Sequence, residues 1–389
     1  MPDAVKQALH DAVENCERYP DPYCTELRRK IAEYEQVPED CVLCGNGAAE
    51  LIYAYAFSLP KGKPALIVSP TFCEYEQALT AAGIAVEHCE RYPDPYCTKL
   101  RRKIAEHEQV PEDCILCGNG AAEMIYAYAF ALPKGKPALI VSPTFCEYEQ
   151  ALTAAGIAVE HHIMKESDGF RLTEDFLQTD FAKYNAVFLC SPNNPTGITV
   201  EPSILHAIAG TGVRLFCDFC FLDLTGTPEK YEIPTLLETC PNLTILRAFT
   251  KSYAMAGVRL GYAMSRDAEF LAAMSAKTQC WNVSALAQAA GIAAMECTDW
   301  LTESVRKISA ERRHLTEELT HLGIRVYPGE ANYLLLYSDT GLYGKLMARG
   351  IMVRDCSNYI GLSSGFVRIA VRTREENDAL LTALKEVLK

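Results

Sequence analysis

A nearly perfect internal repeat constrains this sequence more than any other feature. Residues 16–88 recur as residues 89–161, an offset of 73, and by direct comparison five positions differ: Glu26/Lys99, Tyr34/His107, Val42/Ile115, Leu51/Met124 and Ser58/Ala131. Solenoid repeats diverge far more and normally come in three or more copies. Two near-identical copies instead indicate a recent tandem duplication, an engineered chain or an assembly error, and the sequence does not separate these origins.

Both copies carry the same series of predicted elements. A Tyr-Pro-Asp-Pro turn precedes a helix, and a Gly-Asn-Gly-Ala-Ala-Glu loop opens a second, apolar helix. An apolar run typical of a buried strand then leads to Pro-Thr-Phe-Cys-Glu-Tyr. One sheet has room for only one such unit. Because the second copy (89–161) runs directly into the rest of the chain, we expect it in the main sheet. The first copy (16–88) is then a surplus lobe or a pairing surface for another chain, and the reverse assignment stays open.

The order of elements predicts an α/β fold with two domains. Strands and helices alternate from the second copy onward, which indicates a doubly wound, mostly parallel sheet. Long helices and short strands follow, which indicates a small α+β domain. The expected parts are an N-terminal helix (1–15), the first copy (16–88), a large domain (89–266, with the second copy at 89–161) and a small C-terminal domain (267–389).

The composition limits which partners the protein can bind and which cellular compartment it is expected in. The net charge of −13 argues against nucleic acid or an anionic membrane as a partner. We find no apolar run of about 18 residues, the length of a membrane-spanning helix, and the first residues read as an amphipathic helix rather than a signal peptide. The 17 cysteines are therefore expected to be reduced, in a cytoplasmic protein. Three Cys-x-x-Cys pairs lie where predicted strands enter loops, and no metal site is expected.

A lysine among small residues is the strongest candidate for catalysis. Lys251 follows the apolar run 243–249 and is followed, eight residues on, by Arg259. A lysine at the end of an apolar strand is partly removed from water, which favours the neutral amine that forms Schiff bases. An arginine can hold a phosphate as a planar fork. Taken alone, however, this pattern is more typical of surface charges on a glycine-containing loop.

Other elements give this lysine its context. The turn Ser191-Pro-Asn-Asn-Pro-Thr-Gly197 comes first, then an apolar strand ending in Asp218, then Lys251 and Arg259. In this order they resemble the fold-type I pyridoxal-phosphate enzymes of the aminotransferase class I/II family, over essentially the whole chain. The resemblance implies pyridoxal 5'-phosphate as cofactor, attached to Lys251. It also implies a homodimer and these cofactor contacts: Gly120, Ala121, Ala122, Phe145, Asn194, Asp218, Thr250, Arg259 and, from the partner subunit, Tyr92 or its copy Tyr19.

The C-terminal segment narrows the resemblance. Gly350-Ile-Met-Val-Arg-Asp-Cys-Ser-Asn-Tyr359 and Phe366-Val-Arg-Ile-Ala-Val-Arg372 are similar to threonine-phosphate decarboxylases of cobalamin biosynthesis. These convert L-threonine O-3-phosphate to (R)-1-amino-2-propanol O-2-phosphate. Histidinol-phosphate aminotransferases share most of the same motifs. The resemblance implies that Arg368 binds the substrate carboxylate and that Arg354, with Asn332 nearby, binds its phosphate. Arg372 is a third option.

Several departures from the family pattern keep three functions open. Ala248 stands where a serine or threonine is usual, and Phe221 stands where many relatives have a tyrosine. The family's N-terminal arm, which lines the substrate pocket, has no counterpart before the first predicted helix. The expected function is therefore decarboxylation of threonine phosphate. The alternatives are an aminotransferase of the histidinol-phosphate type and a duplicated, truncated variant that binds the cofactor without activity.

Overall fold

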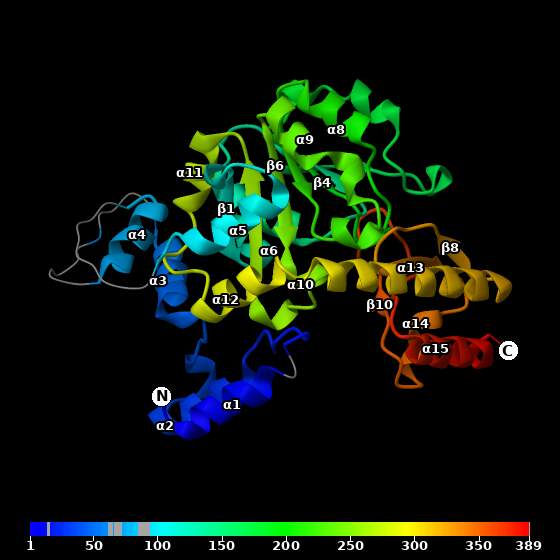
Figure 1. Cartoon of the computed structure of the whole chain (residues 1–389), viewed down its shortest axis with the longest axis horizontal. Coiled ribbons are helices and arrows are strands. Elements are labelled where there is room, and N and C mark those ends of the chain that lie inside the picture. Colours follow the sequence, from blue (N-terminus) through cyan, green and yellow to red (C-terminus); the bar gives the residue numbers. More distant parts are fainter. Residues whose placement is uncertain (14–15, 61–64, 66–71, 85–93, 389) are drawn as a thin grey trace.

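The fold is built on a seven-stranded sheet, seen in the computed structural model of Figure 1. The structure describes residues 1–13, 16–60, 65, 72–84 and 94–388. The strand order is β1-β7-β6-β5-β4-β2-β3, and within this sheet only β7 runs against the others. The strands are β1 (Ile115–Asn119), β2 (Ala138–Ser142), β3 (Val159–Ile163), β4 (Ala186–Cys190), β5 (Arg214–Asp218), β6 (Leu243–Ala248) and β7 (Leu260–Ser265).

Helices cover both faces of this sheet, which explains why its central strands are mostly apolar. Every residue of β2, β4 and β6 is buried. One face packs against α6 (Gly120–Ala131), α7 (Glu147–Ala154) and α11 (Ala268–Ser275). The other packs against α5 (Thr98–Glu108), α8 (Pro202–Ala209), α9 (Ile233–Thr239) and α12 (Ala285–Ala294). The strands β1, β2 and β3 and the helices α5, α6 and α7 all belong to the second copy.

A smaller antiparallel sheet forms the C-terminal part of the fold. Its order is β10-β11-β9-β8, with strands β8 (Arg325–Tyr327), β9 (Tyr333–Tyr337), β10 (Arg354–Asp355) and β11 (Phe366–Ala370). The long helix α13 (Thr298–His321) leads into it, and α14 (Leu342–Met347) and α15 (Arg374–Val387) complete it. Both sheets confirm the predicted α/β class, with a mostly parallel main sheet and a small second one.

The described part of the first copy lies outside the sheet (Figure 1). After α1 (Asp3–Val13) it forms α2 (Thr25–Glu35), α3 (Gly47–Ser58) and α4 (Cys73–Ala81). The last two helices share a small core of their own. Identical sequence is buried differently in the two copies: Leu27 of α2 is 56% exposed, whereas its counterpart Leu100 of α5 is fully buried. Among the described residues, no helix combines the length and the apolar character needed to cross a membrane.

Candidate active site

The predicted site residues follow strands whose carboxyl ends meet at one edge of the main sheet. The strands β1, β2, β4, β5 and β6 run in the same direction. Gly120 follows β1, Phe145 follows β2 and Asn194 follows β4, while Asp218 ends β5 and Lys251 follows β6. Open α/β sheets bind their ligands at this edge. Residues that are 131 positions apart in the sequence are thereby brought to one region.

Lys251 lies in α10 (Phe249–Ser252), a single helical turn after β6. Its Nζ donates a hydrogen bond to Tyr19 Oη at 2.8 Å and lies 5.2 Å from the centre of the Phe221 ring. The neighbouring Ser252 hydroxyl donates to the Asp223 carboxylate, which fixes the turn. The lysine amine is therefore held between an aromatic ring and a phenol.

Asp218 is a buried carboxylate held by two donors. Its Oδ2 accepts from Tyr148 Oη at 2.7 Å and its Oδ1 accepts from the Cys220 backbone N–H at 2.9 Å. Burial, and then the Asp218 charge, raise the pKa of Tyr148, so this phenol stays protonated and donates. The Phe145 ring packs edge-on against Tyr148, with 5.8 Å between ring centres. Tyr148 was not among the predicted site residues. Its place in the same Pro-Thr-Phe-Cys-Glu-Tyr motif as Phe145, three residues further on, was the available signal.

The Arg259 guanidinium packs closely against Gly120 at the start of α6, and this arrangement is called the α6 seat. Gly120 has φ +79°, and a Cβ there would lie 2.6 Å from Arg259 Nη2. At Gly261 of β7, a Cβ would lie 2.6 Å from the Ala121 backbone N. Only glycines allow this close approach of helix, strand and guanidinium. The first turn of α6, which includes Ala121 and Ala122, has free N–H groups, and beside an arginine these suit a phosphate.

Tyr19 of the first copy completes this seat. Its ring centre lies 5.3 Å from the Arg259 guanidinium carbon. Burial raises the pKa of Tyr19, but the charge and hydrogen bond of Lys251, the Thr250 hydroxyl and the charge of Arg259 lower it, and the lowering prevails. The alternative tyrosine of the sequence analysis, Tyr92, lies outside the described residues.

Two arginines lie side by side on adjacent strands of the small sheet. Arg354 of β10 is the direct partner of Arg368 on β11. The Arg368 guanidinium donates to Asn194 Oδ1 and lies 5.0 Å from the centre of the Tyr333 ring, while Arg354 donates to Asn358 Oδ1 at 3.0 Å. Like charges directly opposite each other in a sheet repel, and a bound anion offsets this repulsion. Tyr359 also donates to the Asn194 amide oxygen, at 3.3 Å, a contact the sequence analysis missed.

The structure places Asn332 apart from Arg354, and the role of Asn332 in substrate binding stays a prediction. Asn332 immediately precedes β9, and its carbonyl accepts from Val371 N at 2.8 Å. Since β11 lies between β9 and β10, Asn332 is two strands away from Arg354 and three residues further along, about 14 Å by standard sheet spacings. Spacing along the chain gave no sign of this register. Arg372, the third arginine, forms an ion pair with Glu376 at 2.6 Å.

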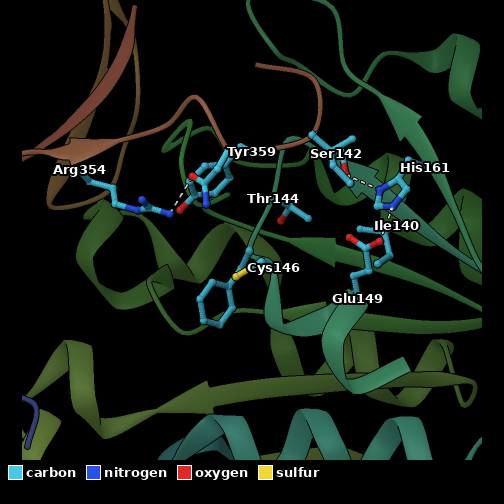
Figure 2. A pocket seen from close by; sticks show the side chains of 11 residues that line it. Ile140, Ser142, Thr144, Cys146, Glu149, His161, Arg354 and Tyr359 are labelled. Atoms are coloured by element: carbon cyan, nitrogen blue, oxygen red, sulfur yellow. Dashed lines mark hydrogen bonds and ion pairs between the residues drawn. The ribbon is translucent and has the colours of Figure 1, made fainter. Parts of the chain in front are cut away.

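A cavity adjoins these groups (Figure 2). On its far side from Arg354, the Ser142 hydroxyl bonds His161 Nδ1 at 2.9 Å, and His161 Nε2 lies 3.7 Å from Glu149 Oε1. These side chains come from β2, β3 and α7, so the fold brings them together and no local motif identifies them. The lining residues are Ile140, Ser142, Thr144, Phe145, Cys146, Glu149, His161, Arg354, Asn358, Tyr359 and Ile360.

The Glu123 carboxylate accepts hydrogen bonds beside the start of α6. Its Oε2 accepts from Asn119 N at 2.7 Å and from Asn282 Nδ2 at 2.6 Å. Burial raises its pKa from 4.5 to about 6, although both hydrogen bonds favour the carboxylate. The folded protein therefore binds this proton more tightly than the unfolded chain does. The stability that protonated Glu123 contributes to the fold is fully present below about pH 4.5 and is lost as the pH rises through about 6.

Glu123→Gln is expected to remove this loss of stability. The amide oxygen still accepts from Asn119 and Asn282 and carries no charge to desolvate. From pH 4.5 to 7.5, the free energy of unfolding of the variant should rise by about 2 kcal/mol relative to wild type. Urea denaturation at both pH values measures this. Glu50→Gln, at the exposed counterpart in the first copy, is the matched control, and an equal change there would contradict the assignment to Glu123.

Known proteins share this arrangement of sequence and fold. The model of the family described as aminotransferase class I and II matches residues 1–97 and 87–384, two matches that follow the internal repeat. The threonine-phosphate decarboxylase of Salmonella typhimurium is 38% identical over 307 residues, 77% of this chain and 84% of that protein. A histidinol-phosphate aminotransferase of Caldanaerobacter subterraneus is 33% identical over 307 residues, 77% of this chain and 85% of its own.

Solved structures agree with these sequence relatives. The histidinol-phosphate aminotransferase from Clostridium acetobutylicum superposes with a TM-score of 0.71 at 30% identity, covering 77% of this chain and 90% of that one. The L-threonine-O-3-phosphate decarboxylase from Porphyromonas gingivalis gives 0.67 at 26% identity, covering 76% and 92%. The family match spans well over half of the sequence. The chain therefore belongs to the aminotransferase class I and II family.

Proposed function

We propose that this enzyme decarboxylates L-threonine O-3-phosphate with pyridoxal 5'-phosphate as cofactor, a step of cobalamin biosynthesis. The observation that carries the proposal is the pair Arg354 and Arg368, directly opposed on β10 and β11 beside the edge where Lys251 lies. A substrate with both a carboxylate and a phosphate can bind two such cations. The 38% identity to the Salmonella typhimurium decarboxylase supports this substrate.

The residues at the sheet edge fit pyridoxal phosphate. Gly120 lets the Arg259 guanidinium lie against the start of α6, so an arginine and the N–H groups of a helix N-terminus stand together, as a phosphate requires. Among the described residues, the buried Asp218 carboxylate accepts from two side-chain or backbone donors, and carboxylates accept up to four hydrogen bonds. Lys251 would attach the cofactor. The other residues that would hold it are Ala121, Ala122, Phe145, Asn194, Thr250 and Tyr19.

The bound cofactor supplies an electron sink for the bond that breaks at the α-carbon of the substrate. Asp218 would favour a protonated ring nitrogen in the bound cofactor, because a carboxylate favours a cation beside it. Arg368 orients the substrate carboxylate and Arg354 its phosphate. The bond from the α-carbon to the carboxylate breaks, carbon dioxide leaves, and Lys251 delivers from Nζ the proton that takes its place. Phe221 keeps water from one side of this amine.

A two-part assay tests the proposal. The purified protein, loaded with pyridoxal phosphate, is given L-threonine O-3-phosphate, and carbon dioxide and 1-amino-2-propanol O-2-phosphate are measured. Amino transfer from histidinol phosphate to 2-oxoglutarate is measured in parallel. Carbon dioxide and phosphoamine in equal amounts are expected. A protein that binds the cofactor but supports neither reaction would be the inactive variant, and the proposed activity would be rejected.

The second candidate is a histidinol-phosphate aminotransferase. The Clostridium acetobutylicum structure, at a TM-score of 0.71 and 30% identity, favours it. The same arginine pair would then bind the two carboxylates of 2-oxoglutarate in one half-reaction and the phosphate in the other. Amino transfer without release of carbon dioxide would establish this candidate.

Removing either opposed arginine is expected to weaken substrate binding more than turnover. Arg354→Ala should raise the KM for threonine phosphate about 10- to 100-fold, since one charge-assisted contact is lost. It should leave inhibition by a ligand that carries only a carboxylate unchanged. Arg372→Ala is the control, because that guanidinium is already paired with Glu376. Steady-state kinetics measure all three. An equal effect at Arg372 would refute the assignment of Arg354.

A further inference from the structure

The first copy contacts the second in a self-matching way. Phe57 of α3 stacks on Phe130 of α6, with ring centres 5.2 Å apart and planes at 23°. These are the same position of the repeat, 73 residues apart. A contact between a position and its own equivalent is what a two-fold axis produces in an isologous dimer. At this position the two copies therefore meet inside one chain as equivalent positions of two subunits meet on such an axis.

Asn282 reinforces this pairing at the glycine-rich loops. Its backbone carbonyl accepts from Asn46 Nδ2 of the first copy at 3.4 Å. Its side chain donates to the carbonyl of Cys117 at 3.2 Å and to Glu123 Oε2 at 2.6 Å, both in the second copy. One asparagine thus joins the two equivalent loops. Lys277 adds a contact from the same segment, donating to the carbonyl of Ala81 at 3.0 Å.

The first copy also enters the active site through backbone contacts. Gly257 N donates to the carbonyl of Cys16 at 2.9 Å. A Cβ at Gly257 would lie 2.8 Å from the carbonyl oxygen of Arg18, so the chain before Tyr19 is seated where a side chain would exclude it. Tyr19 then reaches Lys251 at 2.8 Å. These contacts with Gly257 and with the Lys251 amine argue against a lobe that has no role in the site.

We propose that the first copy is a built-in partner subunit: it supplies Tyr19 to the lysine site of its own chain and covers the α6 surface around Phe130, so that one chain holds a complete site as a monomer. Under this proposal a second chain does not bind at the α6 surface around Phe130, because Phe57 of the first copy already covers that ring. This differs from the homodimer that the family resemblance implies. The contact between the first copy and the α6 surface does not depend on which reaction the enzyme catalyses.

Sedimentation velocity tests the covering in the full chain. Wild type is expected to remain monomeric from low to high micromolar concentration. Phe57→Asp should release the lobe from α6 and produce concentration-dependent dimers, and Phe57→Asp with Phe130→Asp should return the protein to a monomer. Tyr55→Asp is the matched control, since Tyr55 on the same helix is 69% exposed. A dimeric wild type, or a Phe57→Asp variant that stays monomeric, would overturn the proposal.

A spectroscopic titration tests whether Tyr19 acts within its own chain. Pyridoxal phosphate is added to the full-length protein and its absorbance is followed against pH. Tyr19→Phe should shift the absorbance transition by about one pH unit, the effect of losing one charge-assisted hydrogen bond. Tyr92→Phe and the exposed control Tyr23→Phe should leave it in place. A shift with Tyr92→Phe instead would mean that a second chain supplies the tyrosine, and the proposal would fall.

The two experiments separate this proposal from the proposed function. A wild-type protein that shows no pyridoxal phosphate absorbance refutes the cofactor assignment and with it the role of Tyr19. The sedimentation result still stands or fails on Phe57 and Phe130 alone.

Discussion

Lys251→Ala is expected to lower the rate of carbon dioxide release at least about 1,000-fold, because it removes both the amine that attaches the cofactor and the group that returns a proton. Lys251 is the cation that lies against Tyr19 and Phe221, and its hydrogen bond to Tyr19 is 2.8 Å long. The measurement is the initial rate with threonine phosphate at saturating pyridoxal phosphate.

Chemical trapping checks the same residue without relying on turnover. Wild type loaded with pyridoxal phosphate and reduced with borohydride should carry the label on the peptide that contains Lys251. Lys183→Ala, a surface lysine paired with Asp180 at 3.4 Å, should keep both label and activity. A label on any other lysine would contradict the assignment, whatever the activity of the variants.

Asp218→Asn is the second replacement with a large expected effect. An asparagine keeps the shape and still accepts from Cys220 N, so the fold is retained. It lacks the negative charge that holds a proton on the cofactor ring. The rate of carbon dioxide release should fall about 100- to 1,000-fold, the usual cost of losing one electrostatic group at a reacting centre. Steady-state kinetics give the rate, and thermal unfolding verifies the fold.

Tyr148→Phe separates the charge of Asp218 from its placement. It removes the hydrogen bond to Oδ2 but leaves the carboxylate in position through Cys220 N. A loss of about 1 kcal/mol in stability and a drop in rate well below that of Asp218→Asn are expected. If both variants lost the same activity, Asp218 would act only as a hydrogen-bond partner of Tyr148.

Local sequence patterns were sufficient to predict several strands of this fold. The apolar run before Pro-Thr-Phe forms β2 (Ala138–Ser142), the strand expected to end in Asp218 is β5, and the run 243–249 contains β6. Each of these strands has one or both faces buried, so the pattern of its residues reflects its surroundings directly. The order of motifs likewise predicted that residues from Gly120 to Lys251 follow successive strands.

Contacts between distant segments could not be predicted from such local patterns. The opposition of Arg354 and Arg368 depends on strand register, which spacing along the chain does not fix when a strand is two residues long. The separation of Asn332 from Arg354 likewise follows from the register of β9, β11 and β10. The reach of Tyr19 to Lys251 depends on how a separate lobe packs, and an identical tetrapeptide occurs in both copies.

The double occurrence of one segment also gives the folding chain two nearly degenerate topologies. Either copy can enter the sheet, because the positions that contact it are almost the same: Met124 in the second copy stands where the first has Leu51, and Ile115 where the first has Val42. Leu and Met have similar volumes, and Ile and Val differ by one methylene group, so each exchange changes stability by no more than about 1.5 kcal/mol. Differences this small leave chain connectivity to favour the second copy, which continues directly through β3 toward β4.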